Sequence, residues 1–346
     1  MRIGEREIGA GQPVYIVAEL SANHHQRVEE ALKLVDAAAD AGADAVKLQT
    51  YTPDTLTIDC DKAPFRIARV TLWEGKTLYQ LYSEAYTPWE WHGQIKEAAE
   101  GRGLAFFSTP FDGSAIQFLE TLGVPCYKIA SFEIVDLPLI TRAAATRRPL
   151  IMSTGMATLA EIEEAVRAAR DGGASAIALL KCTSGYPANP REMNLRTIPH
   201  LAAAFGVTVG LSDHTLGIAV PIAAVALGAT IIEKHLTLSR SDPGPDSAFS
   251  LEPHEFKAMV EAVRTVREAV GEVSYALGTE EARSRAFRRS LYVVRQVRAG
   301  EIFSEENVRS IRPDGGLPPR YLPIVLGRRA SRDIERGTPL DWTCVE

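Results

Sequence analysis

Eight short apolar stretches rich in β-branched residues alternate with longer helical patterns along most of this chain. Repeated strand–helix units of this kind build a parallel sheet. Eight strands with helical crossovers in about 270 residues match a (β/α)8 barrel in number and size. We therefore predict an α/β TIM-barrel fold, with a doubly wound sheet as the alternative. The expected strands are residues 14–19, 44–49, 104–109, 126–131, 149–153, 176–182, 208–212 and 230–235.

One interval in this pattern is irregular, because nearly twice the usual length of chain separates the second and third expected strands. An insertion after a barrel strand lies on the C-terminal face, where barrel enzymes keep their chemistry. The spacing of apolar residues predicts an amphipathic lid helix whose core face carries Leu78, Leu81, Tyr82 and Ala85. The alternative is that Trp73 and the nearby tyrosines form a surface for a ligand.

The pattern changes near the C-terminal end of the chain. We assign residues 1–275 to the barrel, the polar stretch 276–290 to a linker, and residues 291–346 to a small β-rich domain. A segment of this size is marginally stable alone, so we expect it to dock on a barrel. Its strand-like runs are LYVVRQV, NVRSI and PIVLGRRAS.

Composition excludes several classes of protein. The 346 residues carry a formal charge of -6, which provides no electrostatic footprint for nucleic acid or an anionic membrane. The longest apolar run, residues 218–232, is shorter than the ~20 residues that span a bilayer. Four cysteines with no zinc-type spacing and no secretory signal at the start indicate a reducing cytoplasm.

Polar side chains stand at or just beyond the ends of nearly all the expected strands. In a barrel these positions converge on one rim. Helix capping or solvation explains any one of them but explains the whole set poorly. The residues are Glu19, Lys47, Gln49, Thr109, Lys128, Ser131, Glu133, Ser153, Ser184, Ser212, His214 and His235.

Two of these residues, Lys47 and Lys128, lie inside otherwise apolar strands, where an unpaired ammonium is costly to bury. They indicate a bound polyanion, and serine hydroxyls are the donors that phosphate oxygens accept. The alternative is that Glu19 and Glu133 pair with the lysines, and both arrangements are compatible with an empty enzyme. The candidate phosphate-binding hydroxyls belong to Ser131, Ser153, Ser184 and Ser212.

His214 and His235 follow the seventh and eighth strands, which are neighbours in a closed barrel. Their imidazoles are therefore expected to share one divalent metal, although a lone histidine is more often simply hydrogen-bonded. Two histidine ligands with open positions suit a catalytic Mn²⁺, Mg²⁺, Co²⁺ or Zn²⁺ rather than a closed structural site. We expect Asp213 to orient His214.

The motifs, taken in order along the chain, resemble those of the sialic acid synthase family. They are AELSANHHQ, ADAVKLQTY, KIASFEI, STGM, KCTSGYPA, GLSDHT, EKHLTL, GPDSAFSLEP and IRP, and they cover nearly the whole chain. TLWEGKTLYQLYSEAYTPWEWH and CTSGYPA resemble the pseudaminate branch of the family more than the N-acetylneuraminate branch. Ser184 stands where the N-acetylneuraminate branch usually has asparagine, and this departure leaves one hydrogen bond on the phosphate side in doubt.

The resemblance implies a barrel followed by an antifreeze-like (SAF) domain, in a domain-swapped homodimer where each SAF domain caps the partner's barrel. Arg312 of the IRP motif would reach the sugar across the dimer. His214 and His235 would bind the metal, with Mn²⁺ as the first choice and Mg²⁺ or Co²⁺ as alternatives.

The resemblance also implies roles for the residues on the rim. Residues expected to hold phosphoenolpyruvate are Lys47, Thr109, Lys128, Ser131, Ser153, Ser184 and Ser212. Residues expected to meet an acetamido hexose are Glu19, Gln49, Tyr186 and Asp246. Catalysis is assigned to Glu133, Glu19 and Lys128, with Glu133 or a metal-bound water as the base that activates water.

The expected reaction condenses phosphoenolpyruvate with 2,4-diacetamido-2,4,6-trideoxy-L-altrose and releases phosphate and pseudaminic acid. N-acetylneuraminate or legionaminic acid synthesis is the alternative within the family. A non-catalytic carbohydrate- or ice-binding protein and a metal-dependent pyruvate aldolase are alternatives from other classes. Buried lysines and paired histidines disfavour the first of these, and the serines expected to bind phosphate disfavour the second.

Overall fold

The computed structural model describes residues 1–67, 72–242 and 244–346. The chain divides into two compact units, Met1–Gly271 and Glu272–Glu346. The first residue of the TLWEGK motif lies outside the described residues. No helix in the described part of the chain is long and apolar enough to cross a membrane.

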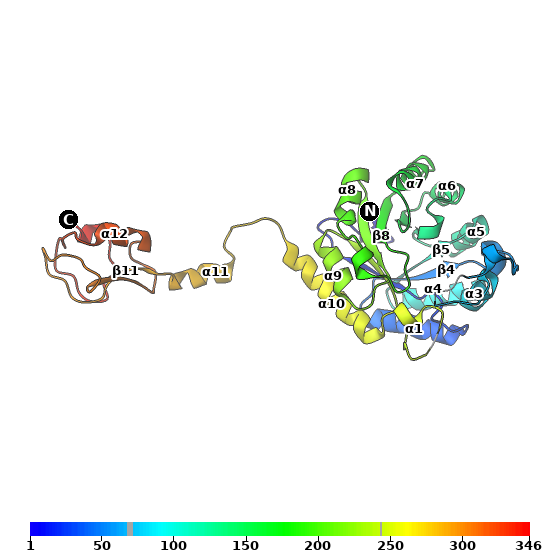
Figure 1. Ribbon diagram of the computed structural model, residues 1–346, viewed down its shortest axis with the longest axis horizontal. Coiled ribbons are helices and arrows are strands. Elements are labelled where there is room, and N and C mark those ends of the chain that lie inside the picture. The colour runs from blue at the N-terminus through cyan, green and yellow to red at the C-terminus, as the bar shows by residue number, and fades with distance from the viewer. Residues whose placement is uncertain (68–71, 243) are drawn as a thin grey trace. The chain divides into compact units, whose positions relative to one another are not determined.

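The first unit is a closed barrel of parallel strands surrounded by helices (Figure 1). Sequence neighbours pair around the ring, and β10 closes it by pairing with β3. The predicted TIM barrel is confirmed and the doubly wound sheet is wrong, because an open sheet would leave two unpaired edges. The strands are β3 Tyr15–Glu19, β4 Ala45–Thr50, β5 Ala105–Pro110, β6 Tyr127–Ile129, β7 Leu150–Ser153, β8 Ile177–Cys182, β9 Thr208–Asp213 and β10 Ile231–His235.

The helices around the barrel bury one apolar face each against the strands. In α7, for example, Ile162, Ala165, Val166 and Ala169 are buried, and Thr158 caps the helix by accepting a hydrogen bond from the Glu161 amide. The helices are α1 Val28–Asp40, α4 His92–Gly101, α5 Gly113–Leu122, α6 Leu137–Ala145, α7 Leu159–Asp171, α8 Thr197–Phe205, α9 Ala219–Ala226 and α10 Pro253–Val270. A short hairpin, β1 Arg2–Ile3 and β2 Arg6–Glu7, precedes the barrel.

The insertion between β4 and β5 contains short helices. The Thr77 hydroxyl accepts a hydrogen bond from the Gln80 amide and so caps α3, the expected lid helix. The elements of the insertion are α2 Pro53–Leu56, η1 Ala63–Phe65, α3 Leu78–Ala85 and η2 Trp89–Trp91, before α4. Single 3₁₀ turns also follow other barrel strands, namely η3 Ser131–Glu133, η4 Pro190–Glu192 and η5 Ser247–Phe249.

The second unit has its own apolar core, to which Leu291, Val293, Phe303 and Val308 contribute. Strands β11 and β12 pair antiparallel. The predicted linker 276–290 contains a helix, and PIVL at the start of the third strand-like run forms a helical turn, so these expectations are corrected. The elements are α11 Thr279–Ser284, η6 Arg285–Phe287, β11 Ser290–Val293, β12 Val308–Ile311, η7 Pro319–Tyr321, α12 Leu322–Val325 and η8 Trp342–Cys344.

Candidate active site

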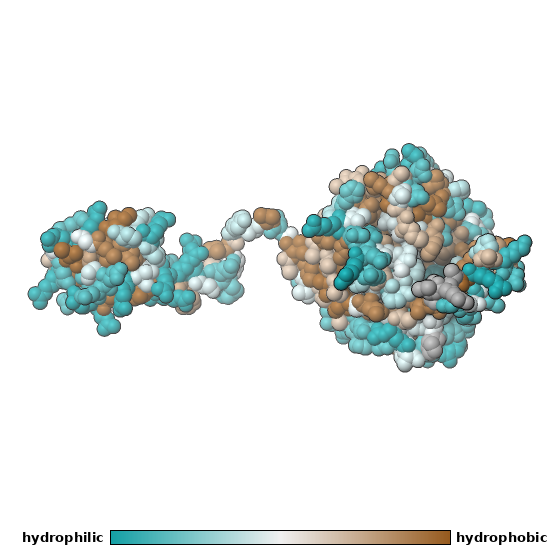
Figure 2. All heavy atoms as spheres, viewed as in Figure 1, coloured by the Kyte–Doolittle hydropathy of each residue, from teal (hydrophilic) through white to brown (hydrophobic). Residues whose placement is uncertain are grey.

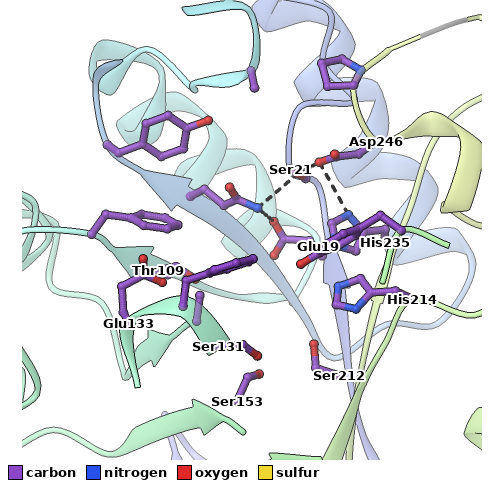
Figure 3. A pocket seen from close by; sticks show the side chains of 18 of the residues that line it. Glu19, Ser21, Thr109, Ser131, Glu133, Ser153, Ser212, His214, His235 and Asp246 are labelled. Carbon is purple, nitrogen blue, oxygen red and sulfur yellow. Dashed lines mark hydrogen bonds and ion pairs between the residues drawn. The ribbon is translucent and has the colours of Figure 1, made fainter. Parts of the chain in front are cut away.

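A cavity of about 530 Å³ lies at the carboxyl ends of the barrel strands (Figure 3). All the residues that the sequence places in the site line this cavity, except Ser184 and Arg312. Arg312 lies in the second unit, where its side chain is exposed, and its role stays a prediction.

The Lys47 ammonium is buried at the bottom of the cavity and has two carboxylate neighbours. It contacts Glu19 Oε2, lies 3.7 Å from Glu233 Oε1, and donates a hydrogen bond of 3.1 Å to the Thr109 hydroxyl. Burial alone would lower the pKa of Lys47, but the two carboxylates outweigh it and raise that pKa. This lysine is therefore a permanent cation, and the predicted Glu19 pair is confirmed.

Lys128 is buried beside it and donates to the Ser153 hydroxyl at 2.6 Å. Burial lowers the pKa of Lys128 below its ordinary value. Within the described part of the chain, the carboxylate that pairs with Lys128 is Glu233, at 3.8 Å, and not Glu133. The expected Glu133 pair is therefore wrong, although the Lys128 charge still opposes the rise in the pKa of Glu133.

Glu233 is a site residue that sequence reasoning missed. It lies on β10 two residues before His235, and side chains two apart in a strand point to the same face. An inward His235 thus implies an inward Glu233, which is the signal that could have found it. Burial alone would raise the pKa of Glu233, but Lys128 and Lys47 outweigh burial and lower it.

Ser131, Ser153 and Ser212 line the cavity (Figure 3), and Ser153 accepts the hydrogen bond from Lys128. The Ser131 hydroxyl accepts a hydrogen bond from the Gly155 amide at 3.1 Å, and the Ser212 hydroxyl donates to Glu233 at 3.1 Å. A Cβ atom on Gly155 would lie 2.4 Å from Ser184 Oγ and 2.7 Å from Ser131 Oγ, so only glycine allows this approach. We call Lys47, Lys128, Ser131, Ser153 and Ser212 the polar wall.

The Glu133 carboxyl also lines the cavity, and its Oε2 atom is buried without a hydrogen-bond partner among the described residues. Burial raises the pKa of Glu133 to about 7, although the charge of Lys128 opposes this shift. A carboxyl that titrates near neutrality can take or give a proton at physiological pH.

His214 and His235 lie next to each other in the cavity lining, with ring centroids 5.2 Å apart. His235 Nδ1 is buried without a hydrogen-bond partner among the described residues and lies 3.9 Å from Asp246 Oδ2. Burial and the neighbouring cations hold the pKa of His235 well below its ordinary value, so its imidazole is neutral. The neutral His235 imidazole, with its free nitrogen, fits a divalent metal. At His214 burial alone would lower the pKa, but Cys182 outweighs burial and raises it.

The described residues contain no group of three or more His, Cys, Asp and Glu side chains arranged to hold a metal. Two histidine ligands would leave open positions around a bound ion, which suits a catalytic rather than a closed structural site.

Cys182 is a second residue that sequence reasoning did not place in the site. Its Sγ atom lies 3.8 Å from His214 Nδ1, and it lines the cavity. Burial alone would raise the pKa of Cys182, but His214 outweighs burial and lowers it to about 7. Cys182 ends β8 in register with Ser212, and this pairing places both residues at the same level of the barrel.

The remaining polar groups surround the cavity mouth. Gln49 Nε2 donates to Glu19 Oε1 and to the Ser21 hydroxyl, both at 3.2 Å, and Ser21 donates in turn to Asp246. The Tyr186 ring packs edge-on against the His214 ring with centroids 4.6 Å apart. These side chains can bind several hydroxyl or amide groups of a ligand.

The insertion supplies a wall of a different kind. The side chains that the described part of the insertion places on the cavity are uncharged, and the face of α3 predicted as core lines the cavity. The Trp73 indole donates to the Pro245 carbonyl at 2.9 Å and packs against Tyr186. The apolar wall consists of Leu56, Ile67, Trp73, Leu78, Leu81, Tyr82 and Ala85.

Comparison with known proteins identifies the family of both parts of the chain. Residues 34–275 match the NeuB family, and residues 288–346 match the SAF domain. The chain belongs to the NeuB family. This NeuB-family chain is 46% identical over 340 residues to the pseudaminic acid synthase of Campylobacter jejuni, covering 98% of each chain. The predicted family and SAF domain are confirmed.

Two further proteins are similar to this chain over most of its length. The N,N'-diacetyllegionaminic acid synthase of Legionella pneumophila is 37% identical over 349 residues, covering 99% of this chain and 98% of the relative. The crystal structure of the N-acetylneuraminic acid synthetase of Leptospira borgpetersenii is 33% identical, with a TM-score of 0.73, and covers 82% of this chain and 94% of that one.

Proposed function

We propose that this NeuB-family enzyme is a pseudaminic acid synthase, which condenses phosphoenolpyruvate with 2,4-diacetamido-2,4,6-trideoxy-L-altrose. The observation that carries the proposal is a single cavity lined by two buried lysines, several serine hydroxyls and the imidazoles of His214 and His235. Relatives at 46% identity over 98% of the chain bear the same activity in their name. The lower identity to the legionaminic relative favours pseudaminate over the alternative.

The polar wall binds the phosphate and carboxylate of phosphoenolpyruvate. Lys47 and Lys128 supply the positive charge, and Ser131, Ser153 and Ser212 supply donors to the oxygens. Holding both substrates in one cavity also removes much of the entropic barrier to their reaction. Glu19 and Glu233 neutralise the lysines until the anion arrives.

The sugar aldehyde lies next to the imidazoles. A divalent ion held by His214 and His235, with Mn²⁺ as the first choice and Mg²⁺ or Co²⁺ as alternatives, would polarise the aldehyde oxygen when bound. Gln49, Tyr186 and Asp246 orient the sugar through the hydrogen-bonding groups at the cavity mouth.

Attack of the enol carbon on the aldehyde forms the new C–C bond and leaves a cationic carbon next to the phosphate ester oxygen. Water adds to this carbon, and Glu133 accepts the proton that the water loses. The former aldehyde oxygen takes up one proton and becomes a hydroxyl. The tetrahedral adduct then expels phosphate by cleavage of the C–O bond, and its hydroxyl becomes the keto group as its proton leaves with the phosphate. The pKa of about 7 allows Glu133 to be deprotonated before this step at physiological pH.

The apolar wall accommodates the parts of the sugar that lack hydroxyls. The trideoxy sugar carries a methyl group at C6 and two acetyl methyls, and Leu78, Leu81 and Ala85 offer apolar surface to such groups. A sugar with a C6 hydroxymethyl would bury an unpaired hydroxyl against this wall.

We also propose a domain-swapped homodimer in the cytoplasm, in which Arg312 reaches the partner's sugar. Brown, hydrophobic side chains are visible on the surface of the barrel unit in Figure 2. Phe132 and Val135 after β6, and Met156 and Leu159 after β7, are exposed large hydrophobic residues near the cavity rim. Apolar patches of this kind mark surfaces that a partner covers.

Phosphate release measured with two sugars tests the proposal. The trideoxy sugar should support release with phosphoenolpyruvate, and EDTA should abolish it until Mn²⁺ is restored. Preference for N-acetylmannosamine would overturn the pseudaminate assignment. Product formation without phosphate would indicate a pyruvate aldolase, and sugar binding that survives EDTA without any turnover would indicate a binding protein.

A further inference from the structure

An ion pair joins β9 and β10, and each of its two residues comes directly before one of the site histidines in the sequence. In the register of β9 and β10, Asp213 lies beside Lys234. His214 directly follows Asp213 in the sequence, and His235 directly follows Lys234. Because side chains alternate along a strand, Asp213 and Lys234 point away from the cavity, and neither lines it.

The pair is buried and also holds the backbone beyond it. Lys234 Nζ lies 2.5 Å from Asp213 Oδ2, and both side chains are 0% exposed. The same ammonium donates to the carbonyl oxygen of Thr215. Asp213 Oδ1 accepts from the Thr215 amide at 3.1 Å and from its hydroxyl at 2.9 Å. Lys234 thus holds both residues that flank His214. The expectation that Asp213 orients His214 stays a prediction.

We propose that the Asp213–Lys234 ion pair positions His214 against His235, and so sets the geometry at which the two imidazoles bind a metal. The inference rests on the proposed function, which places a divalent ion between these rings. Asp213 and Lys234 touch neither substrate nor metal, and act only through the backbone of the two histidines.

Stability alone is a poor explanation for this pair. A fully buried ion pair contributes little net stability compared with apolar side chains of similar volume, because both charges lose their hydration. Its geometric effect is specific, however, since an ammonium bound to a carboxylate and a carbonyl fixes three groups in space. Binding of one ion by two imidazoles would need such accuracy, and residues that contact the ligands rather than the metal commonly set it.

Mn²⁺ titration of the metal-stripped full chain tests the proposal, by calorimetry and by the electron paramagnetic resonance spectrum of the bound ion. The double variant Asp213→Asn/Lys234→Met removes both charges together and so leaves no unpaired buried ion. We expect its Mn²⁺ dissociation constant to rise about 10- to 100-fold, with a changed spectrum. Thr215→Val, which removes one hydroxyl bond, should have a smaller effect in the same direction.

A matched control comes from the opposite end of the barrel. Asp44 is also a buried, ion-paired carboxylate, contacting Arg6 and accepting from the Ile16 amide at 2.8 Å. Asp44→Asn should lower the melting temperature and leave Mn²⁺ affinity unchanged.

The outcomes separate the two proposals. If the double variant and Thr215→Val bind Mn²⁺ within twofold of the wild type while His214→Ala does not, the positioning role is overturned and the metal site stands. Equal weakening by Asp44→Asn would also overturn it, because the effect would then be general destabilisation. If His214→Ala binds as the wild type does, the metal assignment of the proposed function fails.

Discussion

Glu233 Oε1 lies 3.8 Å from the ammonium of Lys128, inside the barrel. Burial already lowers the pKa of Lys128, and the Glu233 charge is the largest influence that opposes this shift. The carboxylate therefore keeps the lysine protonated and ready for an anion. The lysine must carry its proton to bind phosphate, so activity falls as pH rises through the lysine pKa.

Glu233→Gln removes that support, and we expect the alkaline limb of the profile for phosphoenolpyruvate kcat/KM to move down by roughly one pH unit. The pH dependence of phosphate release checks this. An alkaline limb at the wild-type position would show that Glu233 does not control the charge of Lys128.

Glu133→Gln should lower kcat by about 100-fold or more, the usual contribution of a general base. In the wild type the base must be deprotonated, so kcat should rise with pH through about 7, the pKa to which burial raises this carboxyl. The variant should lose this acidic limb. Steady-state kinetics from pH 5 to 9 check it, and a variant that keeps the limb would exclude Glu133 as the base.

Gly155→Ala should weaken phosphoenolpyruvate binding, because the new Cβ would displace the Ser131 and Ser184 hydroxyls. Loss of hydrogen bonds to a charged group raises the KM for phosphoenolpyruvate by about tenfold or more, with a smaller effect on the KM for the sugar. Gly93→Ala is the control, since a Cβ there meets no atom within 4 Å. Equal effects of the two variants would contradict the assignment of these serines to the anion.

Leu78→Gln should shift sugar preference, because it places a hydrogen-bonding group on the apolar wall. The ratio of kcat/KM values for the 6-deoxy sugar and its 6-hydroxy analogue should fall by about tenfold, a typical value for a single contact in an apolar pocket. Competition between the two sugars measures the ratio directly. Val270→Gln, at the exposed last residue of α10 and outside the cavity lining, should leave the ratio unchanged. A ratio unchanged in Leu78→Gln would exclude the wall from specificity.

The eight strands could be predicted from sequence because each is an apolar run with a polar group at or near its end, and Glu19, Ser153 and His235 are the last residues of their strands. Glu233 could not be found in this way, because strand ends identify the rim but not the side chains below it. Alternation from His235 would have identified it.

The helical spacing around Leu81 identified an apolar face but not what that face meets. Apolar residues line a cavity for an apolar ligand group as readily as they pack in a core.

The cavity is built from two stretches of chain that can change independently. Barrel strands carry the polar wall, and substitutions there disturb the packed interior of the fold. The apolar wall comes from the single insertion between β4 and β5, a segment outside the barrel's hydrogen-bond network. New sugar preferences can thus arise by exchange of that segment while the chemistry of carbon–carbon bond formation is retained. A library confined to residues 52–85 is the corresponding starting point for engineering.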